Sequence, residues 1–302
     1  MGASTSEAKA AEIDLDHILE ATRKGQWDVH DFDWSRPLEG AEGLSKQELR
    51  DAALMIVFTA GLERQAARIF ALCADYVDDP RAKAIYRLFE RDETRHADAE
   101  MLMAKRYGVG WKDLPLSVRI MFRYLRGNFD NPTRDLYEFT SSQIILFEIG
   151  LDAILIPALK TMMNDPLQAE VFRRIDIDES RHLAMDYWLL ERTGRSIASI
   201  NPGGKLTAKD IPTVAAGLAR SWRRIMTGLV LLPMGFTTMF RHARTMSRRM
   251  VQPERQEKYW NRVRAVPDRA PHAMNIPQYR MGVNFQKQIM RYNQRMMMES
   301  SA

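Results

Sequence analysis

Cysteine and the common cofactor motifs are almost absent from this sequence. Its single cysteine, Cys73, excludes an intramolecular disulfide framework and a Cys-rich zinc site. The sequence has no phosphate-binding glycine loop, dinucleotide fingerprint or zinc-protease motif, so electrons for any redox reaction would have to come from outside the chain. No apolar core follows a basic segment at the N-terminus. We therefore expect no cleaved secretory signal and a cytoplasmic protein.

Acidic residues are scarce in the last third of the chain. The net charge is +5, but residues 205–302 hold 18 Lys plus Arg against 5 Asp plus Glu, a local charge of +13 that leaves −8 for residues 1–204. The acidic part should hold a site that needs carboxylates, and the basic part should face an anionic partner. A basic surface that is merely solvated is the alternative.

Helix-start and helix-stop signals are frequent along the chain. Residues 12–24 predict a short amphipathic helix, and an aromatic loop follows. Four longer helices are each opened by a capping box or by an Asp-Pro or Asn-Pro pair, and glycine closes two of them. These four helices are predicted at 45–76, 79–108, 131–163 and 165–194. We expect an N-terminal helix and loop (1–44), a helical bundle (45–200) and basic C-terminal helices with an extended arm (201–302).

An internal repeat relates the first pair of these helices to the second pair. Glu63 and Glu148 are 85 residues apart. The corresponding residues of the next helix in each pair are separated by 86 residues, namely Pro80 and Pro166, Glu93 and Glu179, His96 and His182, and Gly108 and Gly194. One helix pair that occurs twice predicts a four-helix bundle with pseudo-twofold symmetry. The repeat alone could be purely architectural.

The residues retained in both copies indicate a metal site. Asp-Glu-x-Arg-His occurs at residues 92–96 and again at 178–182. Residues three apart on a helix share a face, so the Glu and the His of each motif can reach the same ions. A single Glu-x-x-His would be weak evidence, and exposed ion pairs are the alternative for both. Two copies, each preceded by a helix with one core glutamate, favour a site.

Glu63 and Glu148 lie in apolar runs, where burial of an unpartnered carboxylate is costly. A metal ion would supply the partner. Four carboxylates balance two divalent ions, whereas the empty cage repels itself, and we expect the metal-free protein to be less stable. Carboxylate and imidazole ligands suit iron or manganese better than structural zinc.

Two core glutamates plus two Glu-x-x-His motifs resemble the ferritin-like di-iron carboxylate superfamily over about residues 45–194. The resemblance implies an all-α, ferritin-like four-helix bundle. It also implies two iron ions, or a mixed Mn/Fe pair, with O2 as co-substrate and an external electron donor such as a ferredoxin or reductase. By this resemblance Glu63, Glu93 and His96 bind one ion and Glu148, Glu179 and His182 bind the other, with Glu93 and Glu179 bridging.

The polar residues that flank the motifs are candidates for a second layer. A ligating imidazole usually donates its other N–H to a carboxylate or carbonyl, and Asp92 and Asp178 are the candidates. Arg95 and Arg181 would balance their charges, with surface ion pairs as the alternative. Asp152, one turn after Glu148, is a further nearby oxygen donor that we interpret as a hydrogen-bonding neighbour.

Two departures from related families narrow the function. Ribonucleotide reductase small subunits usually place a radical tyrosine one turn after the first motif histidine, but that position is Glu100, its repeat mate is Asp186, and Tyr187 lies one residue off. A tyrosyl radical is therefore not expected. Similar N-oxygenases usually add a histidine ligand, yet no histidine occurs between His96 and His182.

The function expected from these features is oxygen activation. The oxidised metal pair would hydroxylate, desaturate or N-oxygenate a small organic substrate. Ferroxidase or iron-storage activity without an organic substrate is the alternative, and a metal-stabilised binding module is a third hypothesis. Aromatic residues near the arginines form no nucleic-acid motif, so we expect no nucleic-acid partner. A homodimer is also considered.

The C-terminal third carries an apolar run at 225–236 that is too short to span a bilayer and contains Pro233. It would either pack on the bundle or contact a membrane surface. Beyond Pro253, further prolines predict an extended arm and a last helix from Gln278. Neighbouring arginines should dock an acidic carrier protein if the run is buried, or an anionic membrane if it is exposed. These arginines are Arg220, Arg223, Arg224, Arg241, Arg244, Arg248 and Arg249.

Overall fold

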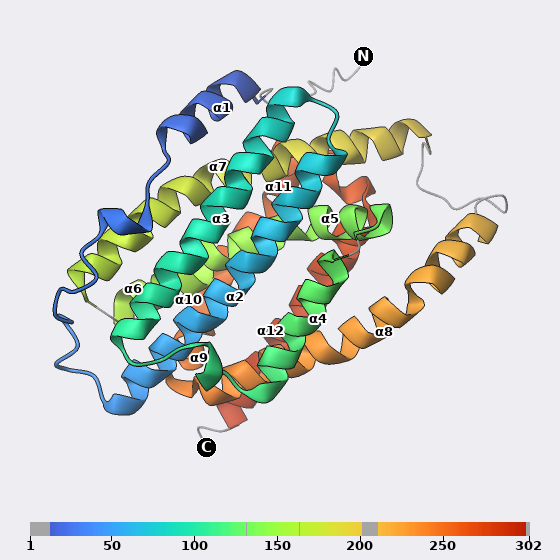
Figure 1. The fold of residues 1–302 in the computed structure, drawn as a ribbon. Coiled ribbons are helices and arrows are strands. Elements are labelled where there is room, and N and C mark those ends of the chain that lie inside the picture. Colours follow the sequence, from blue (N-terminus) through green and yellow to red (C-terminus); the bar gives the residue numbers. More distant parts are fainter. Residues whose placement is uncertain (1–12, 131, 163, 201–210, 300–302) are drawn as a thin grey trace, which may run out of the picture.

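The computed structural model describes residues 13–130, 132–162, 164–200 and 211–299, and within these ranges it contains helices and no strand. Four long segments form the central bundle, as the sequence predicted (Figure 1). They are α2 (Lys46–Tyr76), α3 (Pro80–Arg106), the composite segment α5–η3–α6 (Arg134–Gly150, Leu151–Leu155, Ile156–Met162) and α7 (Pro166–Ile200).

The helix-start signals act as expected. The Glu48 amide donates to the Ser45 hydroxyl at 3.2 Å, and the Ser45 amide donates to the Glu48 carboxylate at 3.0 Å, which completes the capping box of α2. Asp79 caps α3, whose first residue is Pro80. Gly108 follows α3 with φ +71°, the left-handed conformation that glycine adopts without strain. Local sequence therefore fixes the first helical hairpin.

The prediction that Gly194 ends the fourth helix is wrong. α7 continues six residues further, to Ile200. A Cβ atom at Gly194 would lie 2.0 Å from the carbonyl oxygen of His272. Glycine is thus required here because the C-terminal segment crosses the helix at close range.

A π-helical turn explains why the repeat is offset by 85 residues at one position and 86 at the others. The turn, η3, follows directly after the helix that carries Glu148. Because a π turn bonds residue i to i+5, it accommodates one residue more than an α-helical turn. The additional residue lies between Glu148 and Pro166, so the ligand-bearing parts of both helix pairs remain in register.

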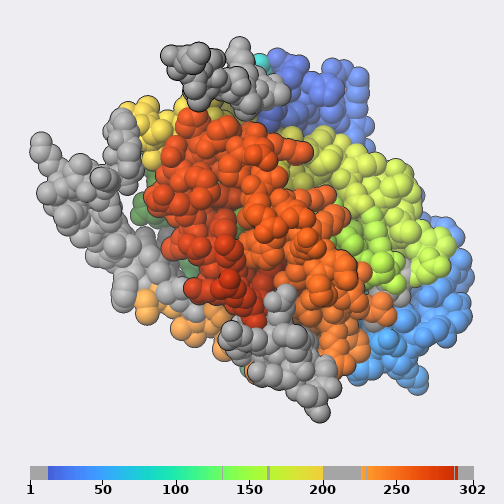
Figure 2. Space-filling model, turned by 180° about the vertical axis from the view of Figure 1, so that it is seen from behind, coloured from blue at the N-terminus to red at the C-terminus, as the bar shows by residue number. Residues whose placement is uncertain are grey.

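Further helices surround the bundle, and η4 (Ala273–Asn275) links two of them. α1 (Leu15–Lys24) lies over α3 and α7, and α4 (Leu116–Phe129), which the sequence signals missed, packs beside α8 (Figure 1). Five helices follow α7, and the later ones, α10 to α12, cover the back of the bundle (Figure 2). In chain order the five are α8 (Ile211–His242), α9 (Arg244–Met250), α10 (Pro253–Arg264), α11 (Val266–Arg269) and α12 (Pro277–Glu299).

The C-terminal arm packs on the bundle, but most of it is helical rather than extended. Pro253, Pro267 and Pro277 occupy the first turns of α10, α11 and α12, where a missing N–H costs nothing. The prolines therefore start helices here. α8 also continues through Pro233. The cost of that proline, about 3 kcal/mol, is offset by packing such as that of Phe236 on Phe58, with ring centroids 5.3 Å apart.

One described helical segment, Arg134–Thr161, is long and apolar enough to cross a membrane. However, 78% of its apolar window is buried within the protein. Ile145 and Ile149 of this segment pack against Tyr259 and Tyr279 of the C-terminal helices. Its hydrophobicity is therefore that of a mostly buried core helix.

Candidate metal centre

The six residues expected to bind metal converge in the centre of the bundle. Each of the four bundle segments contributes at least one of them, and all six residues are at most 2% exposed. They are Glu63 of α2, Glu93 and His96 of α3, Glu148 of α5, and Glu179 and His182 of α7. The two helix pairs of the internal repeat thus place their corresponding residues around one common centre.

Two overlapping groups of these side chains could each hold one metal ion. The first is Glu63, Glu93, His96 and Glu179, and the second is Glu93, Glu148, Glu179 and His182; within each group the ligand atoms lie within 4.8 Å of one another. Glu93 and Glu179 belong to both groups. The geometry therefore fits a dinuclear site with two shared carboxylates and one histidine for each ion.

The ligand atoms of the imidazoles point toward the carboxylates of the opposite repeat. His182 Nδ1 lies 2.8 Å from Glu93 Oε1, and His96 Nδ1 lies 3.3 Å from Glu179 Oε1. Within each motif the corresponding separations are longer, 3.9 Å for Glu93 to His96 and 3.4 Å for Glu179 to His182. Both helices thus direct donor atoms to a common centre.

None of the donor atoms at this centre makes a hydrogen bond of acceptable geometry. All eight carboxylate oxygens of the four glutamates are buried without such a partner, and so is Nδ1 of both histidines. Buried polar groups in native proteins are almost always satisfied, and several unsatisfied anions in one place are very costly. A pair of divalent cations would satisfy these atoms, so the residues present fit a dinuclear metal group.

Without metal, the side chains can approach one another only by sharing protons. Burial, together with the charges of neighbouring carboxylates, raises the pKa of Glu93 and Glu148 well above the usual value. Burial alone would lower the pKa of both histidines. Instead, the hydrogen bond to Asp178 raises the pKa of His96 to about 10, and the charge of Glu179 raises that of His182 to about 9. Metal ions would replace these protons.

A second layer of carboxylates holds the outer nitrogen of each histidine. His96 Nε2 lies 3.0 Å from Asp178 Oδ2, and His182 Nε2 lies 3.5 Å from Asp92 Oδ2. Each aspartate therefore contacts the histidine of the other repeat. With Nε2 facing a carboxylate, Nδ1 is the nitrogen that can donate its lone pair to a metal ion.

Arginines neutralise this second layer. Arg95 donates to Asp92 at 2.6 Å and to Asp178 at 3.2 Å, so it bridges the two repeats, and Arg181 pairs with Asp178. The Arg95 side chain is only 11% exposed, which means that its ion pairs are largely shielded from solvent. In the structure these residues form a buried network rather than surface ion pairs.

The N-terminal segment completes the second layer, and sequence reasoning missed its part. Trp27 Nε1 donates to Asp178 Oδ2 at 2.9 Å, and Gln26 donates to Asp92 at 2.7 Å. The Trp27 ring stacks on His96 with centroids 6.1 Å apart, and the Arg95 guanidinium lies over the Trp27 ring, 4.6 Å from its centroid. Only the aromatic character of this loop was visible in the sequence.

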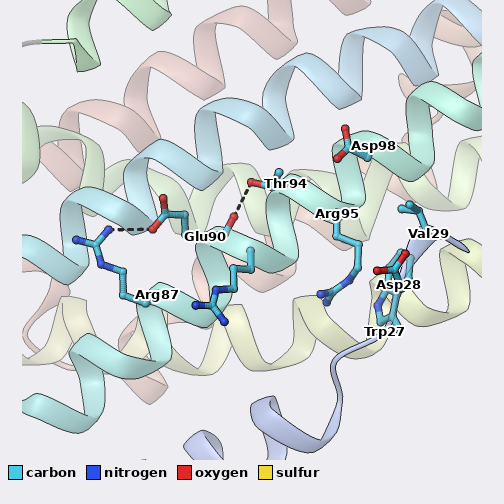
Figure 3. Close-up of a pocket in the computed structure, with 9 residues that line it drawn as sticks. Trp27, Asp28, Val29, Arg87, Glu90, Thr94, Arg95 and Asp98 are labelled. Atoms are coloured by element: carbon cyan, nitrogen blue, oxygen red, sulfur yellow. Dashed lines mark hydrogen bonds and ion pairs between the residues drawn. The ribbon is translucent and has the colours of Figure 1, made fainter. Parts of the chain in front are cut away.

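A surface pocket lies directly outside this layer. It has a volume of about 600 Å³ and is lined by α3 residues together with Trp27, Asp28 and Val29. Figure 3 shows Trp27 and Arg95 along its wall. Through Trp27 and Asp178, a chain of contacts leads from the pocket to His96. The centre is therefore buried, yet it is two side chains away from the surface.

Asp152 lies apart from the centre. It lies on the π-helical turn and forms an ion pair with Arg262 of α10, and its side chain is 29% exposed. It belongs to neither group of candidate ligands. The expectation that Asp152 supports the ligands is therefore not met, because the π turn and the C-terminal helix give it a different partner.

Glu100 and Asp186 lie one turn after the two histidines and are buried to 1% exposure. Burial raises the pKa of both carboxyl groups well above their usual values. Tyr187 instead lies beneath Arg269, whose guanidinium is 5.1 Å from its ring. Carboxyl groups thus occupy the positions at which a radical tyrosine would be sought.

Replacement of Asp92 or Asp178 by asparagine should weaken metal binding by about tenfold to a hundredfold, the usual loss when a partner of a ligating histidine is removed. Asparagine has nearly the same shape, so circular dichroism should remain unchanged. Metal affinity is measured by competition with a chromophoric chelator. Unchanged affinity in both variants would show that the contacts to His96 and His182 do not orient the ligands.

The sequence matches no protein-family model and no curated protein. Among solved structures, dimanganese(II) NrdF from Streptococcus sanguinis is similar, with a TM-score of 0.50 and 11% identity over 94% of this chain and 100% of that one. Two variants of an R2-like ligand-binding oxidase with Mn/Fe cofactors are 15% identical, with TM-scores of 0.47 and 0.46, and cover 88% and 92% of this chain and 95% and 98% of theirs. At such identities the likeness concerns the fold, and the fold is the ferritin-like helical bundle.

Proposed function

We propose that this protein is an oxygen-activating oxidoreductase that binds two iron ions between α2, α3, α5 and α7 and oxidises a small organic substrate. The observation that carries the proposal is the set of eight buried carboxylate oxygens without hydrogen-bond partners, arranged as two overlapping groups. A structural role does not require such an arrangement. A mixed Mn/Fe pair would fit the same donors.

The ligand assignment follows from the two groups. Glu63 and His96 would hold one ion, Glu148 and His182 would hold the other, and Glu93 and Glu179 would be shared. Four carboxylates and two divalent ions together are close to neutral, so the filled centre is compatible with complete burial. Ferrous ions suit this set of oxygen and nitrogen donors.

When bound, such a metal pair supplies the electrons that reduce O2 and the oxidising power that is applied to the substrate. The protein residues keep this chemistry enclosed. Phe89 and Phe70 pack on the His182 ring, with centroids 4.2 and 5.2 Å away, and exclude water from that side. Once metal has replaced the protons, Asp92 and Asp178 would accept the Nε2–H of the imidazoles and so hold the tautomer whose Nδ1 binds the ion.

The electron donor is proposed to be a separate protein, such as a ferredoxin or a reductase, because the sequence has no binding motif for a nicotinamide or flavin cofactor. At the pocket beside Trp27 the second layer reaches the surface, because Trp27 and Arg95 both line it. Docking there would place the donor close to the hydrogen-bonded series Trp27, Asp178 and His96.

The test is oxygen uptake under repeated turnover. Iron-loaded protein is supplied with ferredoxin, its reductase and a panel of small amines, acids and hydrocarbons, and 18O2 incorporation is followed by mass spectrometry. Uptake that continues beyond one oxidation of the bound iron, with labelled or desaturated product, is expected. Uptake that stops after one oxidation with every donor and substrate would favour a ferroxidase instead.

A further inference from the structure

Three helices outside the bundle carry charge of only one sign. Together, α4, α8 and α9 contain ten arginines and no aspartate or glutamate. Arg123, Arg126, Arg241 and Arg248 are among the exposed ones, while the side chains of Arg220, Arg223 and Arg224 lie outside the described set. The rest of the chain is acidic overall, so this region is electrostatically distinct. The metal centre does not require it.

Two of these helices, α8 and α4, also expose large apolar side chains. On α8, Met226, Val230 and Met234 are 41%, 62% and 38% exposed. Because they are four residues apart, they form one stripe along the helix, about 12 Å long at 1.5 Å per residue. On α4, Leu116 and Ile120 are 64% and 39% exposed, again four residues apart.

The other side of α8 is fixed to the protein. Gly235 lies against Met121 of α4, and Gly228 lies against Tyr124. The Phe236 ring contacts Phe58 of the bundle, and Met239 is fully buried. By helical periodicity, positions 226, 230 and 234 point away from the two glycines. α8 therefore packs on α4 with one side and presents the apolar stripe on the other.

We infer that this outer face of α8, which carries the apolar stripe, docks on the surface of a bilayer that contains anionic lipid, with positive charge supplied by the exposed arginines of α8 and of the neighbouring helices α4 and α9. An apolar stripe flanked by arginines is the pattern of helices that lie in the membrane interface, where apolar side chains enter the acyl boundary and arginines meet lipid phosphates. An acidic protein would satisfy the arginines, but it would leave the methionine and valine side chains without an apolar partner. The inference goes beyond the proposed oxidation reaction and does not rest on it.

Flotation of the full, metal-loaded chain with vesicles tests the inference. Vesicles of phosphatidylcholine alone and with phosphatidylglycerol are compared at low and high salt. We expect binding only to the anionic vesicles, and high salt should weaken it because screening shortens the reach of the arginines to a few ångströms. Equal binding to neutral vesicles, or no binding to either kind, would overturn the inference.

Two variants separate the apolar and the electrostatic parts. Val230→Glu combined with Met226→Glu, and separately Arg123→Glu combined with Arg126→Glu, should each weaken binding by about tenfold or more. Ile177→Glu, at a side chain 46% exposed on α7, is the matched control and should bind like the parent. Circular dichroism and metal content verify folding, and the arginine pair keeps the test valid if the stripe variant unfolds.

Two other occupants of the face have distinct signatures. If the face covers a second copy of this chain, light scattering without vesicles will show a dimer that Val230→Glu converts to a monomer. If the face binds an acidic protein, polyglutamate will displace the chain completely from anionic vesicles. The variant with Met226→Glu and Val230→Glu will then bind polyglutamate as the parent does. Either result would replace the membrane surface as the occupant.

Discussion

Replacing Glu93 by alanine should abolish binding of both metal ions, whereas replacing Glu63 or Glu148 should abolish only one. The reason is that Glu93 belongs to both groups of donor atoms, while Glu63 and Glu148 belong to one each. After metal loading and desalting, elemental analysis should give nearly no metal for Glu93→Ala and about half the parent content for the other two. All three variants should lose oxygen-dependent oxidation of Fe(II), because each breaks the paired arrangement.

Glu100→Gln is the matched control for this series. Glu100 is also a buried carboxyl on α3, yet it belongs to neither group of donors. The variant should retain the full metal content, so a loss limited to the donor residues cannot be attributed to burial alone. Equal metal content in the Glu93 and Glu63 variants would contradict the shared position of Glu93. Oxidation of Fe(II) at the parent rate by Glu63→Ala or Glu148→Ala would show that the ligand set is wrong.

Removing the metal should strongly destabilise the protein. A ligand present at a thousand times its dissociation constant stabilises the native state by about 4 kcal/mol, which corresponds to about 6 °C in melting temperature for a chain of this size. The loss after chelation should be at least of this order, because removal of the cations also leaves four buried carboxyl groups close together. Differential scanning calorimetry of the loaded and chelated protein measures the difference.

The stability of the metal-free protein should also fall as the pH rises. The pKa values of His96 and His182 are raised in the fold to about 10 and about 9. The stability that their protonation contributes is therefore fully present below the unfolded value near 6.5, and it is lost as the pH rises through about 9 to 10. The raised pKa values of Glu63, Glu93 and Glu148 act in the same direction, because their ionised forms are disfavoured in the fold.

Urea denaturation of the chelated protein between pH 6 and pH 10 checks this dependence. The free energy of unfolding should decline across the range, and the stabilisation gained on adding metal should increase, because metal ions replace the protons. His182→Gln should flatten the decline in the chelated protein. A stability that rises toward pH 10 without metal would mean that the histidines are not held protonated by the surrounding carboxylates.

Much of this fold was predictable because local signals and the repeat agree. The capping box at Ser45 and the Asp-Pro pair at Asp79 indicated the first helical hairpin. Because helix-start signals recur 86 residues later, the second hairpin could be predicted from the first. Even the 85-residue exception has a structural counterpart in the π turn after Glu148. Convergence of the six donor residues followed from helical periodicity once two identical motifs were recognised.

What the sequence did not reveal depends on contacts between distant segments. Gly194 has the appearance of a helix end, but its role is to let His272 approach, which no local signal encodes. Trp27 reaches Asp178 across 151 residues of sequence, and nothing at their spacing predicts that hydrogen bond. Such contacts are set by how helices cross rather than by the residues around each position.

In the second layer, too, the sequence identified residues but not the contacts that they make. Its aspartates were identifiable because each precedes a ligand glutamate, but the sequence could not tell which histidine each would contact. Asp92 and His96 are one turn apart on the same helix, yet Asp92 contacts His182 and Asp178 contacts His96. The separation of α3 and α7 determines this exchange, and Arg95 stabilises it by bridging both aspartates.

Whether the protein binds two irons that react with O2 can be measured by anaerobic addition of Fe(II) to the metal-free protein, followed by exposure to O2. Elemental analysis and optical spectra are recorded before and after the exposure. We expect two irons bound per chain and an absorption band that appears only when O2 is admitted. One iron or none per chain, or a spectrum that O2 leaves unchanged, would contradict this expectation.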